Sequence, residues 1–183
     1  MLLTTTKPAN ITDYGQLPEG APYQLIGGEL IMSPSPTRFH QDILSNLNSA
    51  LRHYVIEHNL GKVYFAPLDV ELGEYDVFQP DIIFIRKERL SLIKSDRIDI
   101  APDMVIEILS PSSAYYDYSA KKSKYCEHGV EEYWIVDPEQ ESIEIMIKDG
   151  EYYRTDALLR KPSLLQSQMF PGFSMKLEEV FAL

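Results

Sequence analysis

The sequence has one cysteine and no long apolar run. A single cysteine, Cys126, excludes an internal disulfide and is typical of a reducing compartment. No apolar stretch approaches the roughly 18 residues that a membrane-spanning helix requires. The first residues, MLLTTTK, hold too short an apolar run for a signal peptide. We therefore expect a cytoplasmic protein.

Positive charge is also scarce. The chain has 17 Lys and Arg residues against 28 Asp and Glu residues, a formal net charge of −11 at pH 7. Proteins that bind nucleic acid by bulk electrostatics usually present a basic face to the phosphates, so this balance argues against that class. The objection weakens if a metal ion and a few lysines supply the attraction locally.

What the chain does have is enough apolar sequence for one domain. It has 183 residues, 44% of them hydrophobic, which suits a single domain over residues 1–183. Apolar residues recur at helical spacing from Thr37 to about His58, which predicts a helix. Gly61 is the expected C-terminal cap of this helix. A Gly-Gly turn within residues 23–32 predicts a hairpin, and residues 62–85 suggest a three-stranded meander.

The most informative stretch reads APDMVIEILSPSSAYYDYSAKKSKY. Its first half, Met104–Leu109, is rich in Val, Ile and Leu and bounded by proline, which is typical of a strand buried on both faces. Glu107 interrupts it. Because a buried unpaired carboxylate costs several kcal/mol, Glu107 should find a cation or ionise reluctantly. A helix is expected to follow, with Asp117, Lys121 and Tyr125 along one face.

Two further strands complete the expected sheet. Residues 131–136 contain the only tryptophan, and apolar and polar residues alternate from Ile143 until Gly150 turns the chain back. Ser110, Ser112 and Ser113 are expected to cap the helix after the central strand. The element order predicts an α/β fold, a small mixed sheet flanked by helices.

Two strand carboxylates, Asp81 and Glu107, are the candidate chemical groups. If their strands are neighbours, both side chains can reach the same side of the sheet, where they need a divalent cation or a shared proton. Mg²⁺ usually takes one or two protein carboxylates and keeps several waters, so a sparse pair suits Mg²⁺ better than Ca²⁺. In the alternative interpretation, Asp81 caps a turn and Glu107 pairs with a buried lysine.

A Pro-Asp dipeptide followed on a later strand by Glu resembles the restriction-endonuclease-like superfamily, whose signature is written PD-(D/E)XK. More closely, the chain resembles the Uma-two family of bacterial proteins described as endonucleases, and the resemblance runs from about Tyr23 to Leu183. It is carried by these blocks in order: GGELIMSPSP, His40, APLDVEL, QPDIIFI, APDMVIEILSPSS, Asp117, Lys121, Tyr125 and GVEEYWIVDP. The resemblance implies a restriction-endonuclease-like core with added N-terminal and C-terminal hairpins.

The resemblance also assigns roles to residues. It implies that Asp81 and Glu107 bind the metal ion, Mg²⁺ or Mn²⁺. The superfamily lysine normally follows the second acid by two residues, but Leu109 stands there. The matching lysine is Lys121 on the next helix, with Lys122 and Lys124 as rivals.

Two other residues are weaker site candidates. Glu29 matches the family's Gly-Glu position and is a third candidate metal ligand. His40 opens the long helix, where backbone N–H groups favour anions, so it is a candidate for binding substrate phosphate. A histidine in such a place also serves as a cap or a packing residue.

The expected function is metal-dependent hydrolysis of DNA phosphodiester bonds by a homo-oligomer, and the expected assembly is a dimer. The ion would activate water and neutralise charge on the phosphate, and Lys121 would orient the water or stabilise negative charge. One alternative is a nuclease-like module that has lost activity and binds DNA or protein. Another is a homodimeric structural protein whose carboxylates have no catalytic role.

Overall fold

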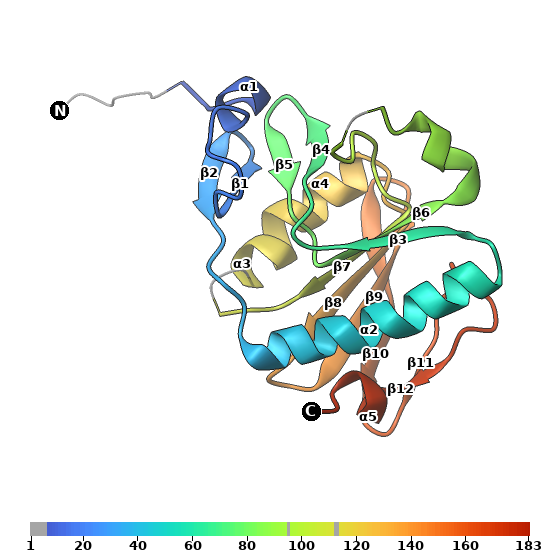
Figure 1. Ribbon diagram of the computed structural model, residues 1–183. Coiled ribbons are helices and arrows are strands. Elements are labelled where there is room, and N and C mark those ends of the chain that lie inside the picture. The colour runs from blue at the N-terminus through green and yellow to red at the C-terminus, as the bar shows by residue number, and fades with distance from the viewer. Residues whose placement is uncertain (1–6, 95, 112–113) are drawn as a thin grey trace.

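The computed structural model describes residues 7–94, 96–111 and 114–183. Its main layer is a six-stranded sheet in the order β10-β9-β8-β7-β6-β3 (Figure 1). Strands β7 and β8 are parallel and every other neighbouring pair is antiparallel, so the sheet is mixed. The strands are β3 (Gly61–Phe65), β6 (Ile82–Arg86), β7 (Met104–Ile108), β8 (Glu132–Asp137), β9 (Ser142–Asp149) and β10 (Tyr152–Arg160).

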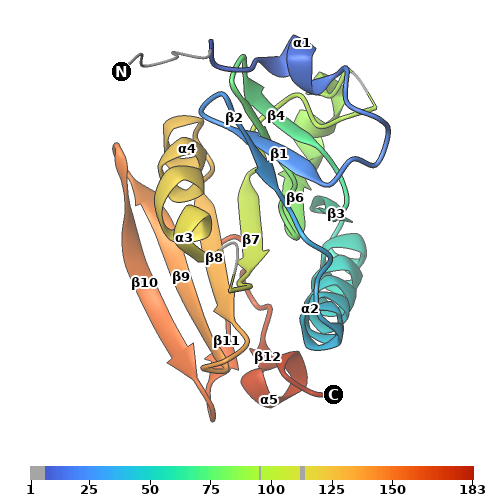
Figure 2. The same ribbon diagram turned by 90° about the vertical axis from the view of Figure 1, so that its left-hand side faces the viewer.

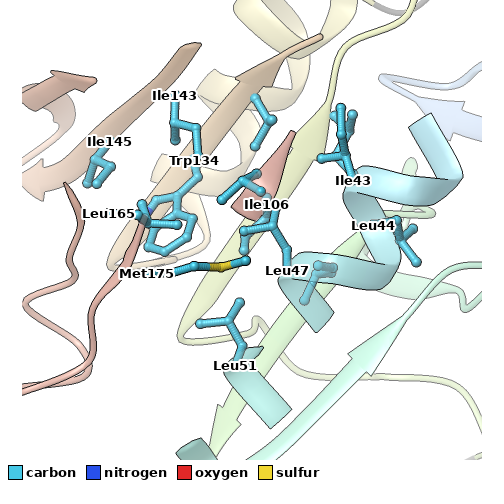
Figure 3. Packing of buried hydrophobic residues seen from close by; sticks show 14 of the residues in the cluster. Ile43, Leu44, Leu47, Leu51, Ile106, Trp134, Ile143, Ile145, Leu165 and Met175 are labelled. Carbon is cyan, nitrogen blue, oxygen red and sulfur yellow. The ribbon is translucent and has the colours of Figure 1, made fainter. Parts of the chain in front are cut away.

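Helix α2 (Arg38–Glu57) covers one face of this sheet, and helices α3 (Ala114–Tyr116) and α4 (Lys122–Glu127) cover the other (Figure 2). Alternate residues of each strand feed the two cores, as the period of two requires. On the α2 face, Leu47 and its helical neighbours pack against Ile106 of β7 and Trp134 of β8 (Figure 3). The expected mixed α/β architecture with helices on both faces is confirmed.

Helix α2 begins and ends close to its predicted limits. The hydroxyl of Thr37 accepts the N–H of His40 and caps the first turn. The prediction that Gly61 caps the last turn is wrong, because Asn59 adopts the left-handed conformation there, with φ 53°. Gly61 instead opens β3, where a Cβ atom would collide with the Ile85 carbonyl.

The predicted meander over residues 62–85 is also wrong, because its strands divide between two sheets. Strand β3 pairs with β6, whereas β4 (Val70–Gly73) and β5 (Asp76–Phe78) join a smaller sheet in the order β2-β1-β5-β4. Pro80, which has no backbone N–H, lies between β5 and β6 where the chain leaves one sheet for the other.

The smaller sheet contains the predicted N-terminal hairpin, β1 (Tyr23–Ile26) with β2 (Glu29–Met32). At the other end of the chain, β9 and β10 form the predicted hairpin as part of the main sheet. The short elements are α1 (Ile11–Tyr14), the 3-10 helix η1 (Lys87–Leu92), β11 (Leu164–Leu165), β12 (Met175–Lys176) and α5 (Leu177–Val180). No helix within the described ranges has the length and apolar character needed to cross a membrane.

The helix after β7 is interrupted by a π-helical turn, η2 (Asp117–Lys121), between α3 and α4. Ser112 and Ser113, two of its predicted caps, lie outside the described residues, while the carbonyl of Ser110 accepts the N–H of Ala114. Single π turns inside α-helices occur often at functional sites. Here the turn directs Asp117 and Lys121 into the protein, and both are buried.

Candidate active site

The two predicted carboxylates come together at the end of β6 and β7. Ile82 of β6 lies opposite Ile106 of β7, so extending this antiparallel register by one residue places Asp81 opposite Glu107. Directly opposed residues in such a pair have Cβ atoms roughly 5 Å apart. Oδ2 of Asp81 accepts the backbone N–H of Ile108 at 2.7 Å. This register, together with the hydrogen bond from Ile108 to Asp81, places the two acids on neighbouring segments at one end of the sheet.

Glu107 finds the cation that its burial requires. Its side chain is only 4% exposed, and Oε1 accepts hydrogen bonds from Lys121 Nζ at 3.1 Å and from the Tyr125 hydroxyl at 2.7 Å. Of the rival lysines, Lys124 pairs with Glu127 at 3.1 Å instead. The fourteen-residue separation of Glu107 and Lys121 is thus closed by the helix that follows β7, as the sequence suggested.

Asp117 is a third buried carboxylate that the sequence analysis did not assign to the site. Its Oδ1 lies 2.8 Å from Lys121 Nζ, so one ammonium group contacts two buried acids. Beyond this ion pair, the oxygens of Asp117 have no hydrogen-bond partner among the described residues. The signal for it was available, because Asp117 and Lys121 have i, i+4 spacing on one helix face.

The electrostatics follow from that shared cation. Burial raises the pKa of Glu107 to about 8; the Lys121 ammonium opposes the shift, and the charges of Asp117 and Asp81 add to it. Burial by itself would lower the pKa of Lys121, but Glu107 and Asp117 outweigh it and raise that pKa. Because one ammonium can balance only one carboxylate, the second acid is left with excess negative charge nearby.

His40 contacts Asp81 from the other side of the sheet. Its Nε2 lies 2.9 Å from Asp81 Oδ1, and both side chains are largely buried. The structure therefore places this histidine against a candidate metal ligand. Its predicted role was contact with a substrate phosphate.

Glu29 lies apart from this group. It is exposed at the start of β2, beside the Gly27-Gly28 turn of the smaller sheet. Among the residues that the structure describes, no three His, Cys, Asp or Glu side chains approach closely enough to hold a metal ion. The structure thus brings together Asp81, Glu107, Lys121 and His40, but it does not bring Glu29 to them.

The chemistry of the acids suits a hard divalent cation. Asp81 and Glu107 offer only oxygen donors, and Mg²⁺ needs no more than one or two carboxylates from the protein. Both described hydrogen bonds of Glu107 end on one oxygen, Oε1. The charges of Asp117 and Asp81 both act on Glu107, whereas a single ammonium group, that of Lys121, opposes them, and this excess negative charge favours a cation.

One solved structure has this architecture over nearly its whole length. A crystal structure described as "a putative nuclease belonging to DUF820 from Anabaena variabilis ATCC 29413" is similar with a TM-score of 0.81 and 22% identity, over 96% of this chain and 98% of that one. The type IIG restriction endonuclease BpuSI gives a TM-score of 0.41 and 14% identity, over 84% of this chain and 17% of that one. No curated protein matches the chain.

The family match covers most of the sequence. Residues 11–178 match the Uma2 family, described as "Putative restriction endonuclease". This is the family that the sequence blocks resembled, and the restriction-endonuclease-like fold expected from that resemblance is confirmed by the DUF820 structure. The chain belongs to the Uma2 family.

Proposed function

We propose that the protein is an endonuclease that hydrolyses DNA phosphodiester bonds and depends on Mg²⁺ or Mn²⁺. The observation that carries this proposal is the convergence of Asp81, Glu107 and Lys121 at one end of the sheet in a member of a nuclease family. Two acids and one ammonium group from three separate elements match the superfamily signature in chemistry, although the lysine comes from a different position in the chain.

Asp81 and Glu107 would hold the ion. When bound, a divalent ion in such a site polarises the phosphate and lowers the pKa of a coordinated water. Lys121 places its ammonium group against Glu107, where it opposes the rise in the pKa of that carboxyl group and stabilises negative charge that develops beside it. Asp117 in turn holds Lys121 from the helix side.

Nicking of supercoiled plasmid DNA with Mg²⁺ tests the proposal. We expect the wild-type protein to nick the plasmid and Glu107→Gln and Lys121→Ala to lose that activity. Lys124→Ala is the matched control, because this lysine lies one helical turn further on and pairs with Glu127. Circular dichroism must show that each variant is folded. Unchanged nicking by either site variant removes that residue from the mechanism.

A nuclease-like module without activity is the second candidate. Leu109 in place of the superfamily lysine and the net charge of −11 both favour it. This alternative predicts that the wild-type protein shifts DNA in a gel but nicks no plasmid with either metal ion. Binding of a protein partner without DNA binding would support an interaction module.

The proposal includes a cytoplasmic location and a homodimer. An enzyme that cuts both strands of a duplex gains from a two-fold arrangement of two sites, since the strands are themselves related by two-fold symmetry. Light scattering coupled to size-exclusion chromatography measures the mass of the assembly, and a 21.0 kDa particle would contradict the dimer.

A further inference from the structure

We propose that His40 is a positioning residue for Asp81, fixing the orientation in which this carboxylate meets a metal ion. The inference rests on the proposed metal site. The sequence suggested that His40 contacts a substrate phosphate. The structure gives it a different role, because the imidazole ring of His40 makes a hydrogen bond to the Asp81 carboxylate.

The carboxylate of Asp81 is fixed from two directions. Oδ2 accepts the backbone N–H of Ile108 at 2.7 Å, and Oδ1 lies 2.9 Å from Nε2 of His40. Residue 108 belongs to β7, whereas residue 40 belongs to α2, so two separate elements hold the two oxygens. Without His40, only the contact with Ile108 would remain, and the carboxylate could rotate about it.

His40 is itself firmly placed. Its backbone N–H is capped by Thr37 at 3.2 Å, and its ring is 10% exposed. The twenty-residue helix that carries it is anchored on the sheet by Ile43 and Leu47, neither of which is exposed. A side chain on such a rigid support can set the position of its partner to within a fraction of an ångström.

The hydrogen-bond chemistry gives the contact a direction. An ionised carboxylate only accepts, so Nε2 of His40 must donate. The other ring nitrogen, Nδ1, is buried and has no hydrogen-bond partner within the described part of the chain. The contact with Asp81 is therefore the single described hydrogen bond of the ring. Groups that orient metal ligands in this way typically change metal affinity roughly 10- to 100-fold when removed.

Titration of the full-length protein with Mn²⁺ by calorimetry tests the proposal. His40→Leu keeps the volume but loses the donor, whereas His40→Gln keeps an N–H donor. We expect His40→Leu to weaken Mn²⁺ binding roughly tenfold and His40→Gln to restore most of it. The control is His53→Ala, on the same helix, whose side chain is 82% exposed; it should bind Mn²⁺ as the wild type does.

The outcomes separate this inference from the proposed function. Equal Mn²⁺ affinity of the Leu and Gln variants would show that the ring only fills space, and would overturn the positioning role even if the plasmid is nicked. The expected order of affinities in a protein that nicks no DNA would uphold the role and reject the enzyme. Failure of the wild type to bind Mn²⁺ would overturn both.

Discussion

Glu107 and Glu132 are two acids on neighbouring parallel strands, each almost fully buried, yet their surroundings differ in kind. Glu132 lies on the α2 face beside Trp134. It accepts hydrogen bonds from Trp134 Nε1 at 2.7 Å, the Ser167 hydroxyl at 2.7 Å and the Met169 backbone N–H at 3.2 Å. Glu107, on the opposite face, shares an ammonium group with another acid.

The comparison separates a structural carboxylate from a reactive one. Burial raises the pKa of Glu132, while the hydrogen bonds from Ser167, Trp134 and Met169 oppose the shift. Those neutral donors satisfy both oxygens and tie the C-terminal segment to the sheet. Glu107 instead lies among like charges, so of these two acids it is the one with an electrostatic reason to bind a cation.

Removal of the shared cation should have the largest effect. Lys121→Ala leaves Glu107 and Asp117 buried without an ammonium group, and breaking a buried pair costs about 3–5 kcal/mol of unfolding free energy. Urea unfolding at pH 8 measures the loss. At pH 5 the loss should be smaller, because an unpaired buried acid takes up a proton. The control is Arg38→Ala, which removes a largely exposed ion pair with Asp42 worth less than about 1 kcal/mol. Equal losses for Lys121→Ala at the two pH values would refute the charge argument.

Truncation of the structural acid should have an intermediate effect on stability. Glu132→Ala leaves the donors of Trp134, Ser167 and Met169 unpaired, for a loss of about 2–3 kcal/mol. Plasmid nicking by the folded variant should match the wild type, because Glu132 lies on the other face of the sheet. A loss of nicking at temperatures where the variant is fully folded would erase the distinction between the two acids.

A further expected effect is on the pH dependence of melting. The pKa of Glu107 is about 8 in the folded protein against 4.5 for an ordinary Glu, so between these pH values the folded state holds more protons than the unfolded state. Stability should therefore fall as pH rises from 5 to 9. Glu107→Gln should flatten that decline, because the variant lacks the carboxyl group that titrates. Parallel curves for the two proteins would show that Glu107 ionises normally.

The central strand, the long helix and the paired acids could be predicted from the sequence because each has a local signal. A charge inside an apolar run identified Glu107, and helical spacing placed Lys121 on one face with Asp117. The division of β3 to β6 between two sheets had no such signal, since the predicted strands differ only in their partners. The contact of His40 with Asp81 spans 41 residues and depends on how α2 packs on the sheet. The C-terminal partners of Glu132 are equally remote in sequence.

The π-helical turn carries an evolutionary consequence. It accommodates one residue more than a regular α-helical turn, as a single-codon insertion would produce. Deleting a residue between Asp117 and Lys121 would restore the regular spiral while the helix on either side kept its phase. The two side chains would then have i, i+3 spacing and would still be neighbours on the helix surface. Homologues without the extra residue should therefore still present this acid and this lysine on the same helix face.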